Sequence, residues 1–230
     1  FISALLFRLG NVKKNIGYNR EGRGFLLDFS PEINYHKHYI NRYAFLFNEY
    51  IGNKYVYLPE LSLRYTGQKT FQFDNSHKTI ALYLGGENKE FRKYPDEYAV
   101  QLLRLLNRQG YNLLLIGDEN DNIKHTQYAE EARIDHLINL TARTTIEGFI
   151  NTIANVDLII TIDSSALHIA AAVKTPFIAL MGLSTSPTST ILPKVPLGRI
   201  LKIENNLIRE EDYIRNITPD LILKTISELI

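Results

Sequence analysis

An aspartate, two serines and a histidine lie close together within Asp157–Leu183, DLIITIDSSALHIAAAVKTPFIALMGL. The β-branched run LIITI predicts a buried strand, Asp163-Ser164-Ser165 a capping turn, and the Ala-rich run after it a short helix. The N–H groups at the start of such a helix, and the positive end of its dipole, favour a phosphate. Because His168 lies one turn beyond Ser164, its imidazole can reach the same spot. The stretch therefore predicts an anion site.

A simpler interpretation exists for each residue alone. Asp163 can be only a helix cap, and His168 only a histidine on a helix surface. Their combination at the carboxyl end of a strand, where open α/β sheets bind ligands, favours the binding site.

Two other turns carry groups that suit a nucleotide. Gly85–Pro95 contains two glycines and then Arg92 and Lys93 just before a predicted helix, a pattern that suits a diphosphate, although a solvated charged loop is a serious alternative. In Gly117–Asp121, carboxylates at Asp118, Glu119 and Asp121 can accept from ribose hydroxyls, although helix capping is the simpler explanation.

Composition excludes several classes of protein. The 230 residues carry a net charge of +1, so bulk charge gives no indication of nucleic-acid binding. The absence of Cys excludes disulfides, Cys-ligated zinc and cysteine nucleophiles. No apolar run approaches the roughly 20 residues of a membrane span, and FISALLF at the start is too short for one. Because the chain begins at Phe1 inside an apolar segment, we expect it to be part of a longer protein.

From residue 79 onward, strands and helices alternate without a hairpin signal, which predicts a doubly wound parallel α/β sheet. Residues 53–78 are rich in Pro, Gly, Asn and Ser, so we predict a domain boundary near Asn75, between residues 1–75 and 76–230. Within the first part, the pattern predicts a helix end at 1–9, strands at Asn15–Asn19 and Phe25–Phe29, and a helix within 38–52.

The stretch D-S-S-A-L-H-I-A-A-A-V-K-T-P resembles the donor-site signature of the heptosyltransferase-type glycosyltransferases of family 9. Ser165 departs from the glycine usual there, which bears on the closest backbone approach to the phosphates. The residues that match the signature are Asp163, Ser164, His168, Ala170, Ala171 and Pro176.

Other segments resemble the same family in order. Counted back from Pro95, Arg92 takes the position of a phosphate-contacting lysine and Tyr94 that of a tryptophan. Met181–Pro187, with Gly182, is similar to a loop that closes over the nucleotide, and Leu140–Thr145 to a further wall of the pocket. Two segments of the first part, K-N-I-G-Y-N-R-E-G-R and the helix that begins near His38, resemble segments that lie on the acceptor side of the cleft in this family. The resemblance implies sugar-phosphate contacts from Arg20, Arg23 or His38.

The resemblance implies a GT-B-like fold with two facing Rossmann-type domains, the first only partly present. It also implies transfer of a heptose or related sugar from a nucleotide-diphospho-sugar to a lipopolysaccharide core acceptor, with ADP-heptose as the leading candidate for the donor. It implies no metal and no cofactor, a lipid-linked saccharide acceptor at the membrane surface, and a cytoplasmic location with the inner face of the bacterial inner membrane as a peripheral site. The general base is expected in a segment that precedes this chain, so none is named. The implied donor-binding residues are Gly86, Arg92, Lys93, Asp121, Asp163, Ser164, Ser165, His168 and Gly182.

One alternative keeps the fold without the catalysis: a truncated or degenerate relative that binds nucleotide or a protein partner. A dinucleotide-dependent oxidoreductase and a sugar-nucleotide epimerase are disfavoured, because no G-x-G-x-x-G opens a helix, and the epimerase also lacks a Tyr-x-x-x-Lys pair.

Overall fold

The computed structural model describes residues 1–55, 61–73, 76–183, 192–193, 195–203 and 209–230. These residues form two compact units, which we describe separately. The first comprises Phe1–Glu60 with Ser186–Leu192, and the second comprises Leu61–Thr185 with Pro193–Ile230. The predicted boundary residue, Asn75, lies outside the described residues.

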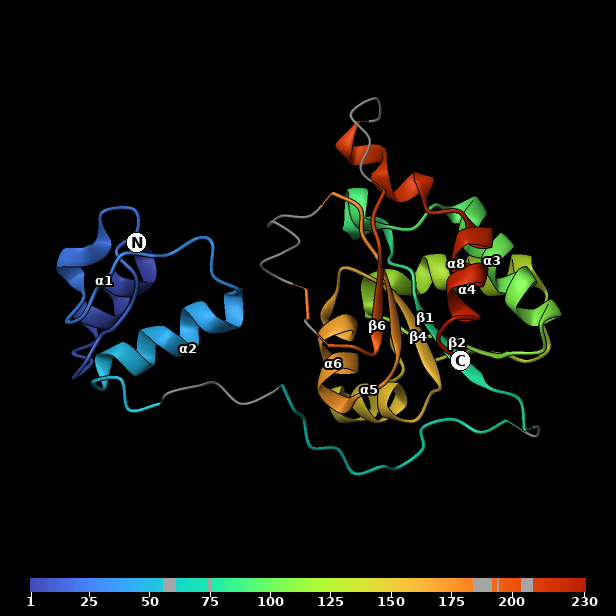
Figure 1. Ribbon diagram of the computed structural model, residues 1–230, viewed down its shortest axis with the longest axis horizontal. Helices are drawn as coiled ribbons and strands as arrows, with labels where there is room; N and C mark the ends of the chain where they lie inside the picture. The colour runs from blue at the N-terminus through green and yellow to red at the C-terminus, as the bar shows by residue number, and fades with distance from the viewer. Residues whose placement is uncertain (56–60, 74–75, 184–191, 194, 204–208) are drawn as a thin grey trace. The chain divides into compact units, whose positions relative to one another are not determined.

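A six-stranded sheet forms the centre of the second unit, in the order β3-β2-β1-β4-β5-β6, with every neighbouring pair parallel. From β1 the chain adds β2 and β3 on one side and then β4, β5 and β6 on the other side. The predicted doubly wound parallel sheet is therefore confirmed (Figure 1). The strands are β1 (Thr79–Tyr83), β2 (Asn112–Leu115), β3 (Leu137–Asn139), β4 (Leu158–Ile162), β5 (Phe177–Leu180) and β6 (Gly198–Leu201).

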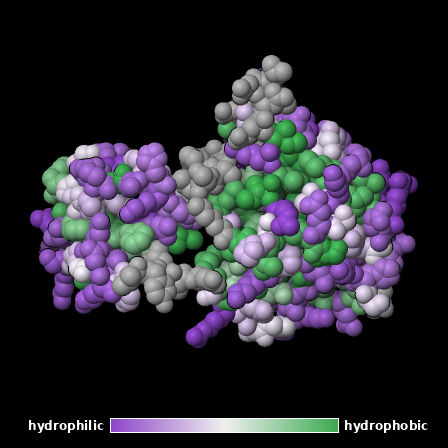
Figure 2. Space-filling view, viewed as in Figure 1, coloured by the Kyte–Doolittle hydropathy of each residue, from purple (hydrophilic) through white to green (hydrophobic). Residues whose placement is uncertain are grey.

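Helices cover both faces of this sheet (Figure 1). Along β1 the side chains alternate, so Ile80 and Leu82 join the core under α3, whereas Tyr83 packs edge-on against Phe149 of α5. In Figure 2, hydrophilic side chains cover most of the visible surface over α3 and α4. The helices of this unit are α3 (Asp96–Arg108), α4 (Asn122–Ala132), α5 (Ile146–Ala154), α6 (Ser165–Val173) and α8 (Pro219–Ile226), with short 3-10 helices η2 (Glu87–Arg92), η3 (Glu119–Asp121) and η4 (Glu210–Asn216).

An extended segment, residues 61–73, lies along α5 and α6 of the same unit. The Gly67 N–H donates to Asn151 Oδ1 (3.1 Å), and the Asn151 amide donates back to Thr66 Oγ1 (2.9 Å). Near the start of the segment, the Leu63 N–H donates to the Ala172 carbonyl (3.2 Å). Although its composition is typical of a connection, the segment is therefore fastened to the sheet unit.

The first unit contains α1 (Ile2–Leu9), η1 (Arg23–Leu26) and α2 (Tyr39–Tyr50), so both predicted helices are confirmed. The two predicted strands are wrong: Asn15–Asn19 and Phe25–Phe29 make only isolated bridges, and η1 occupies the start of the second. The two segments share a few backbone hydrogen bonds, such as the Gly17 N–H to the Phe29 carbonyl (3.1 Å), and the Asn15 N–H donates to the Asp28 carboxylate (2.7 Å) instead of extending a ladder.

Candidate functional site

The carboxyl ends of β1 and β4 lie side by side at the point where the strand order reverses. In open α/β sheets this is the crevice that receives ligands. Three turns meet this edge: the one after β1 leads through η2 to α3, the one after β2 leads into η3, and the one after β4 leads into α6. The candidate site is built from these turns.

The turn after β4 has the predicted strand–turn–helix form. Ser164 is the N-cap of α6, and its Oγ accepts from the Ala166 N–H (3.2 Å) while lying 3.0 Å from Thr161 Oγ1. Ser165, the first helical residue, is exposed, and Asp163 and His168 are half-buried. The turn therefore presents the start of a helix and its positive dipole end.

Arg92 joins the first turn to the third. Its Nη1 donates to the Asp163 carbonyl oxygen (3.4 Å). Tyr94, two residues further on, is fully buried and holds the loop in place. Its N–H donates to the Leu84 carbonyl (3.0 Å), and its hydroxyl donates to the Ile217 carbonyl (2.8 Å). A guanidinium is thereby positioned beside the start of α6, and its expected contact with a phosphate stays a prediction.

Lys93 takes part in a different network, at the start of α3. Its Nζ lies 2.7 Å from Asp96 Oδ1, and Asp96 also accepts from Lys124 (2.9 Å) and the Tyr128 hydroxyl (2.6 Å). Partial burial acts to raise the pKa of Asp96, but these hydrogen bonds outweigh it and lower that pKa to about 2. Lys93 thus has a structural partner, and its predicted role with the donor stays a prediction.

In the turn after β2 the two aspartates have different positions. Asp121 is fully buried, and its Oδ2 accepts from the Asp118 N–H (3.0 Å), while Asp118 Oδ1 accepts from the Asn120 N–H (2.8 Å). The two side chains form a capping box. Burial raises the pKa of Asp121. The simpler interpretation therefore describes Asp121, and the exposed carboxylates at this turn are those of Asp118 and Glu119.

Glycines allow the turns to pack against one another. A Cβ at Gly86 would lie 2.4 Å from the Asn120 carbonyl oxygen, and one at Gly182 would lie 2.5 Å from the Phe91 carbonyl oxygen. Both glycines lie where the chain itself approaches closely, so a side chain at either would push neighbouring loops apart. Within the predicted closing loop, Ser184–Pro187 lie outside the described residues.

Behind these turns lies a buried histidine. His125 is fully buried, and its Nδ1 lies 2.8 Å from Oγ1 of Thr141, itself buried within the segment Leu140–Thr145. Burial lowers the pKa of His125 to about 4, so the ring is neutral at pH 7.

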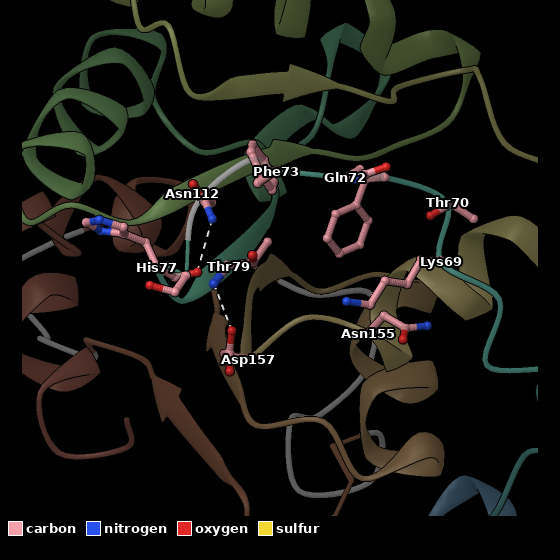
Figure 3. A pocket seen from close by; sticks show the side chains of 11 residues that line it. Lys69, Thr70, Gln72, Phe73, His77, Thr79, Asn112, Asn155 and Asp157 are labelled. Atoms are coloured by element: carbon pink, nitrogen blue, oxygen red, sulfur yellow. Dashed lines mark hydrogen bonds between the residues drawn. The ribbon is translucent and has the colours of Figure 1, made fainter.

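The opposite edge of the sheet, where the strands begin, opens into a cavity of about 810 Å³ (Figure 3). Lys69, Gln72 and Phe73 from the extended segment line one side. On the other side, Asp157 Oδ2 accepts from the Thr79 N–H (2.8 Å), as a dashed line in Figure 3 shows.

The sequence matches the family described as Glycosyltransferase family 9 (heptosyltransferase) over residues 1–211. The chain belongs to this family. It is 31% identical over 158 residues to lipooligosaccharide heptosyltransferase 2 of Haemophilus influenzae, covering 64% of this chain and 45% of that protein, and 25% identical over 172 residues to lipopolysaccharide heptosyltransferase 2 of Salmonella typhimurium, covering 70% and 49%. The chain thus spans about half the length of these relatives.

Solved structures agree on the fold. The structure of Escherichia coli ADP-heptose lps heptosyltransferase II covers 99% of this chain, and 73% of its own chain is covered, with a TM-score of 0.82 at 21% identity. The family resemblance and the GT-B-type fold inferred from it are therefore confirmed. The roles of individual residues are not tested by this likeness.

The residues predicted for the acceptor side of this family 9 chain each have a partner within the first unit. Arg20 Nε lies 3.4 Å from the Glu21 carboxylate, and Arg23 Nε donates to the Tyr18 carbonyl (3.1 Å). His38 caps α2, accepting from the Ile40 N–H (3.3 Å). Among the described residues, the hydrogen bonds and ion pairs of Arg20, Arg23 and His38 go to other partners, so their shared role stays a prediction.

One polar residue at the crevice was missed by the sequence analysis. Lys89 lies in the same loop as Arg92, and its Nζ forms an ion pair with Asp118 Oδ2 (3.0 Å). The loop sequence contains four charged residues besides Lys89, so composition alone did not single it out. Among the described residues no three His, Asp or Glu side chains gather as a metal site.

Proposed function

We propose that the protein transfers a heptose from a nucleotide-diphospho-sugar to a lipopolysaccharide core acceptor. ADP-heptose is the leading candidate for the donor. The single observation that supports this most is the contact of Arg92 with the Asp163 carbonyl, which unites a cation and a helix start at the crevice of a family 9 chain. Relatives named heptosyltransferase 2 supply the sugar and acceptor classes.

The chemistry requires stabilisation of a leaving diphosphate. When the bond between the anomeric carbon and the phosphate oxygen breaks, negative charge accumulates on the nucleoside diphosphate, and fixed cations and N–H groups lower the barrier. In the proposed site, Arg92, the N–H groups at the start of α6 and His168 take this role without a metal or cofactor. Asp163 accepts from sugar hydroxyls.

The acceptor side is proposed only in outline. The attacking hydroxyl needs a base within hydrogen-bond distance, and we assign none among residues 1–230. We propose a cytoplasmic protein that meets a lipid-linked saccharide at the inner face of the inner membrane. Within the described residues, no helix combines the length and apolar character that crossing a membrane requires.

Calorimetric titration with ADP, GDP, UDP and NAD tests the donor site. We expect ADP to bind, and Arg92→Ala and His168→Ala each to weaken it at least about tenfold, because each removes a donor to the diphosphate. Unchanged affinity in both variants would refute the site. Donor binding without heptose transfer to a core acceptor by the full-length protein would favour the binding-only alternative.

A further inference from the structure

Lys89 lies across the crevice at the end of β1. Gly85, the second residue after β1, has a φ of +81°, and a Cβ there would lie 2.7 Å from Ile162 Cδ1 and 3.1 Å from Lys89 Cγ. Ile162 is the last residue of β4. The lysine stem therefore packs at the junction of β1 and β4, where the strand order reverses and a ligand is expected.

The ammonium of Lys89 is held in a defined place. Its Nζ lies 3.0 Å from Asp118 Oδ2 and 5.7 Å from the centroid of the Tyr83 ring. The side chain is 19% exposed, so the charge is partly shielded but still reachable. An ammonium carries three N–H donors, and the bond to Asp118 uses one of them.

Asp118 is well supplied with donors of its own. Oδ1 accepts from the Asn120 N–H (2.8 Å), and Oδ2 accepts from Lys89 (3.0 Å) and the Tyr83 hydroxyl (3.3 Å). Partial burial acts to raise the pKa of Asp118, but the hydrogen bonds from Lys89 and Asn120 outweigh it and lower that pKa. The carboxylate thus stays anionic, and it has enough other donors to remain bonded when Lys89 turns toward a second anion.

We propose that Lys89 is a second diphosphate-binding cation of the donor site, acting with Arg92, and that Asp118 is its counter-ion when no diphosphate is bound. This inference rests on the proposed function. It assigns to Lys89 the part that the sequence pattern suggested for Lys93, whose ammonium is directed to Asp96 instead.

The test is calorimetric titration of wild type and Lys89→Met with ADP and with adenosine. Met keeps an apolar stem over Gly85 and removes the charge. We expect affinity for ADP to fall about tenfold, because a charge-assisted contact is lost, and affinity for adenosine to stay the same. Lys124→Met is the matched control, because Lys124 is also 19% exposed and also pairs with an aspartate, at 2.9 Å. It should bind ADP as wild type does.

A second pair of variants excludes a merely structural effect. Asp118→Asn keeps an acceptor for the Asn120 N–H and removes the competing charge, so affinity for ADP should rise a few fold. Adding Lys89→Met to Asp118→Asn leaves no unpaired charge behind, and the double variant should still bind ADP about tenfold more weakly than Asp118→Asn alone.

The outcomes separate two failures. Wild type that binds no nucleoside diphosphate would overturn the donor site and this inference together. Wild type that binds ADP, with Lys89→Met and the double variant binding it as tightly as their parents, would overturn the inference alone and leave Lys89 as the counter-ion of Asp118.

Discussion

The two edges of the central sheet differ in how their polar groups are used. At the amino edge, around the large cavity of Figure 3, Asp157 accepts from the Thr79 N–H and the Asn112 amide donates to the His77 carbonyl (3.0 Å). These bonds satisfy backbone groups where strands begin. At the carboxyl edge, Arg92 contacts the turn that precedes α6, and Lys89 pairs with Asp118 in the turn after β2. The cavity at the amino edge is therefore not the better candidate, because cations and open N–H groups at a helix start are what suit a diphosphate.

The largest effect we predict is on stability, from the histidine beneath the carboxyl edge. The pKa of His125 is about 4 in the folded protein and about 6.5 when unfolded. The unfolded state therefore binds an extra proton between these values, so stability present above pH 6.5 is lost as the pH falls toward 4, by up to about 3 kcal/mol. Urea denaturation at a series of pH values measures this loss.

The control for this prediction comes from the other edge. His125→Asn should remove that part of the pH dependence, whereas His77→Asn, at an exposed residue of the amino edge, should retain it. Equal pH dependence in wild type and His125→Asn would contradict the assignment.

The aspartates at the two ends of β4 give a direct contrast. Asp157→Ala leaves the buried Thr79 N–H without its acceptor and should cost about 1–2 kcal/mol of unfolding free energy, with ADP-heptose affinity unchanged. Asp163→Ala should weaken the binding of ADP-heptose at least about tenfold, because a sugar hydroxyl loses its acceptor. Denaturation and calorimetry on both variants would show the opposite pattern if the amino edge held the donor.

The smallest effect is expected at Lys93. Lys93→Met removes one of three donors to the partly exposed Asp96. It should therefore lower the free energy of unfolding by less than about 1 kcal/mol and change the affinity for ADP less than twofold. A loss of ADP affinity as large as that in Lys89→Met would restore the sequence-based assignment.

Much of the second unit could be predicted from the sequence because its signals are local. Short β-branched runs such as LIITI favour buried strands, and Ser164 caps a helix by its own side chain. The roles of Lys89 and Lys93 could not be predicted, since the path of η2 decides which stem crosses Gly85. Likewise, the burial of Asp121 depends on packing against Gly86, which lies in another turn.

The first unit was harder to predict for a related reason. Helices depend on local periodicity, and α1 and α2 were both anticipated. A strand needs a partner that the local sequence does not reveal, and Asn15–Asn19 shares only a few backbone hydrogen bonds with residues 28–31, as isolated bridges rather than a ladder.

A crystal structure of the protein with ADP tests the central claim most directly. We expect the diphosphate at the carboxyl edge, within hydrogen-bond distance of the Arg92 guanidinium and the Ser165 N–H, with the Lys89 ammonium turned toward it. A nucleotide bound instead in the cavity at the amino edge, beside Lys69 and Asp157, would contradict it.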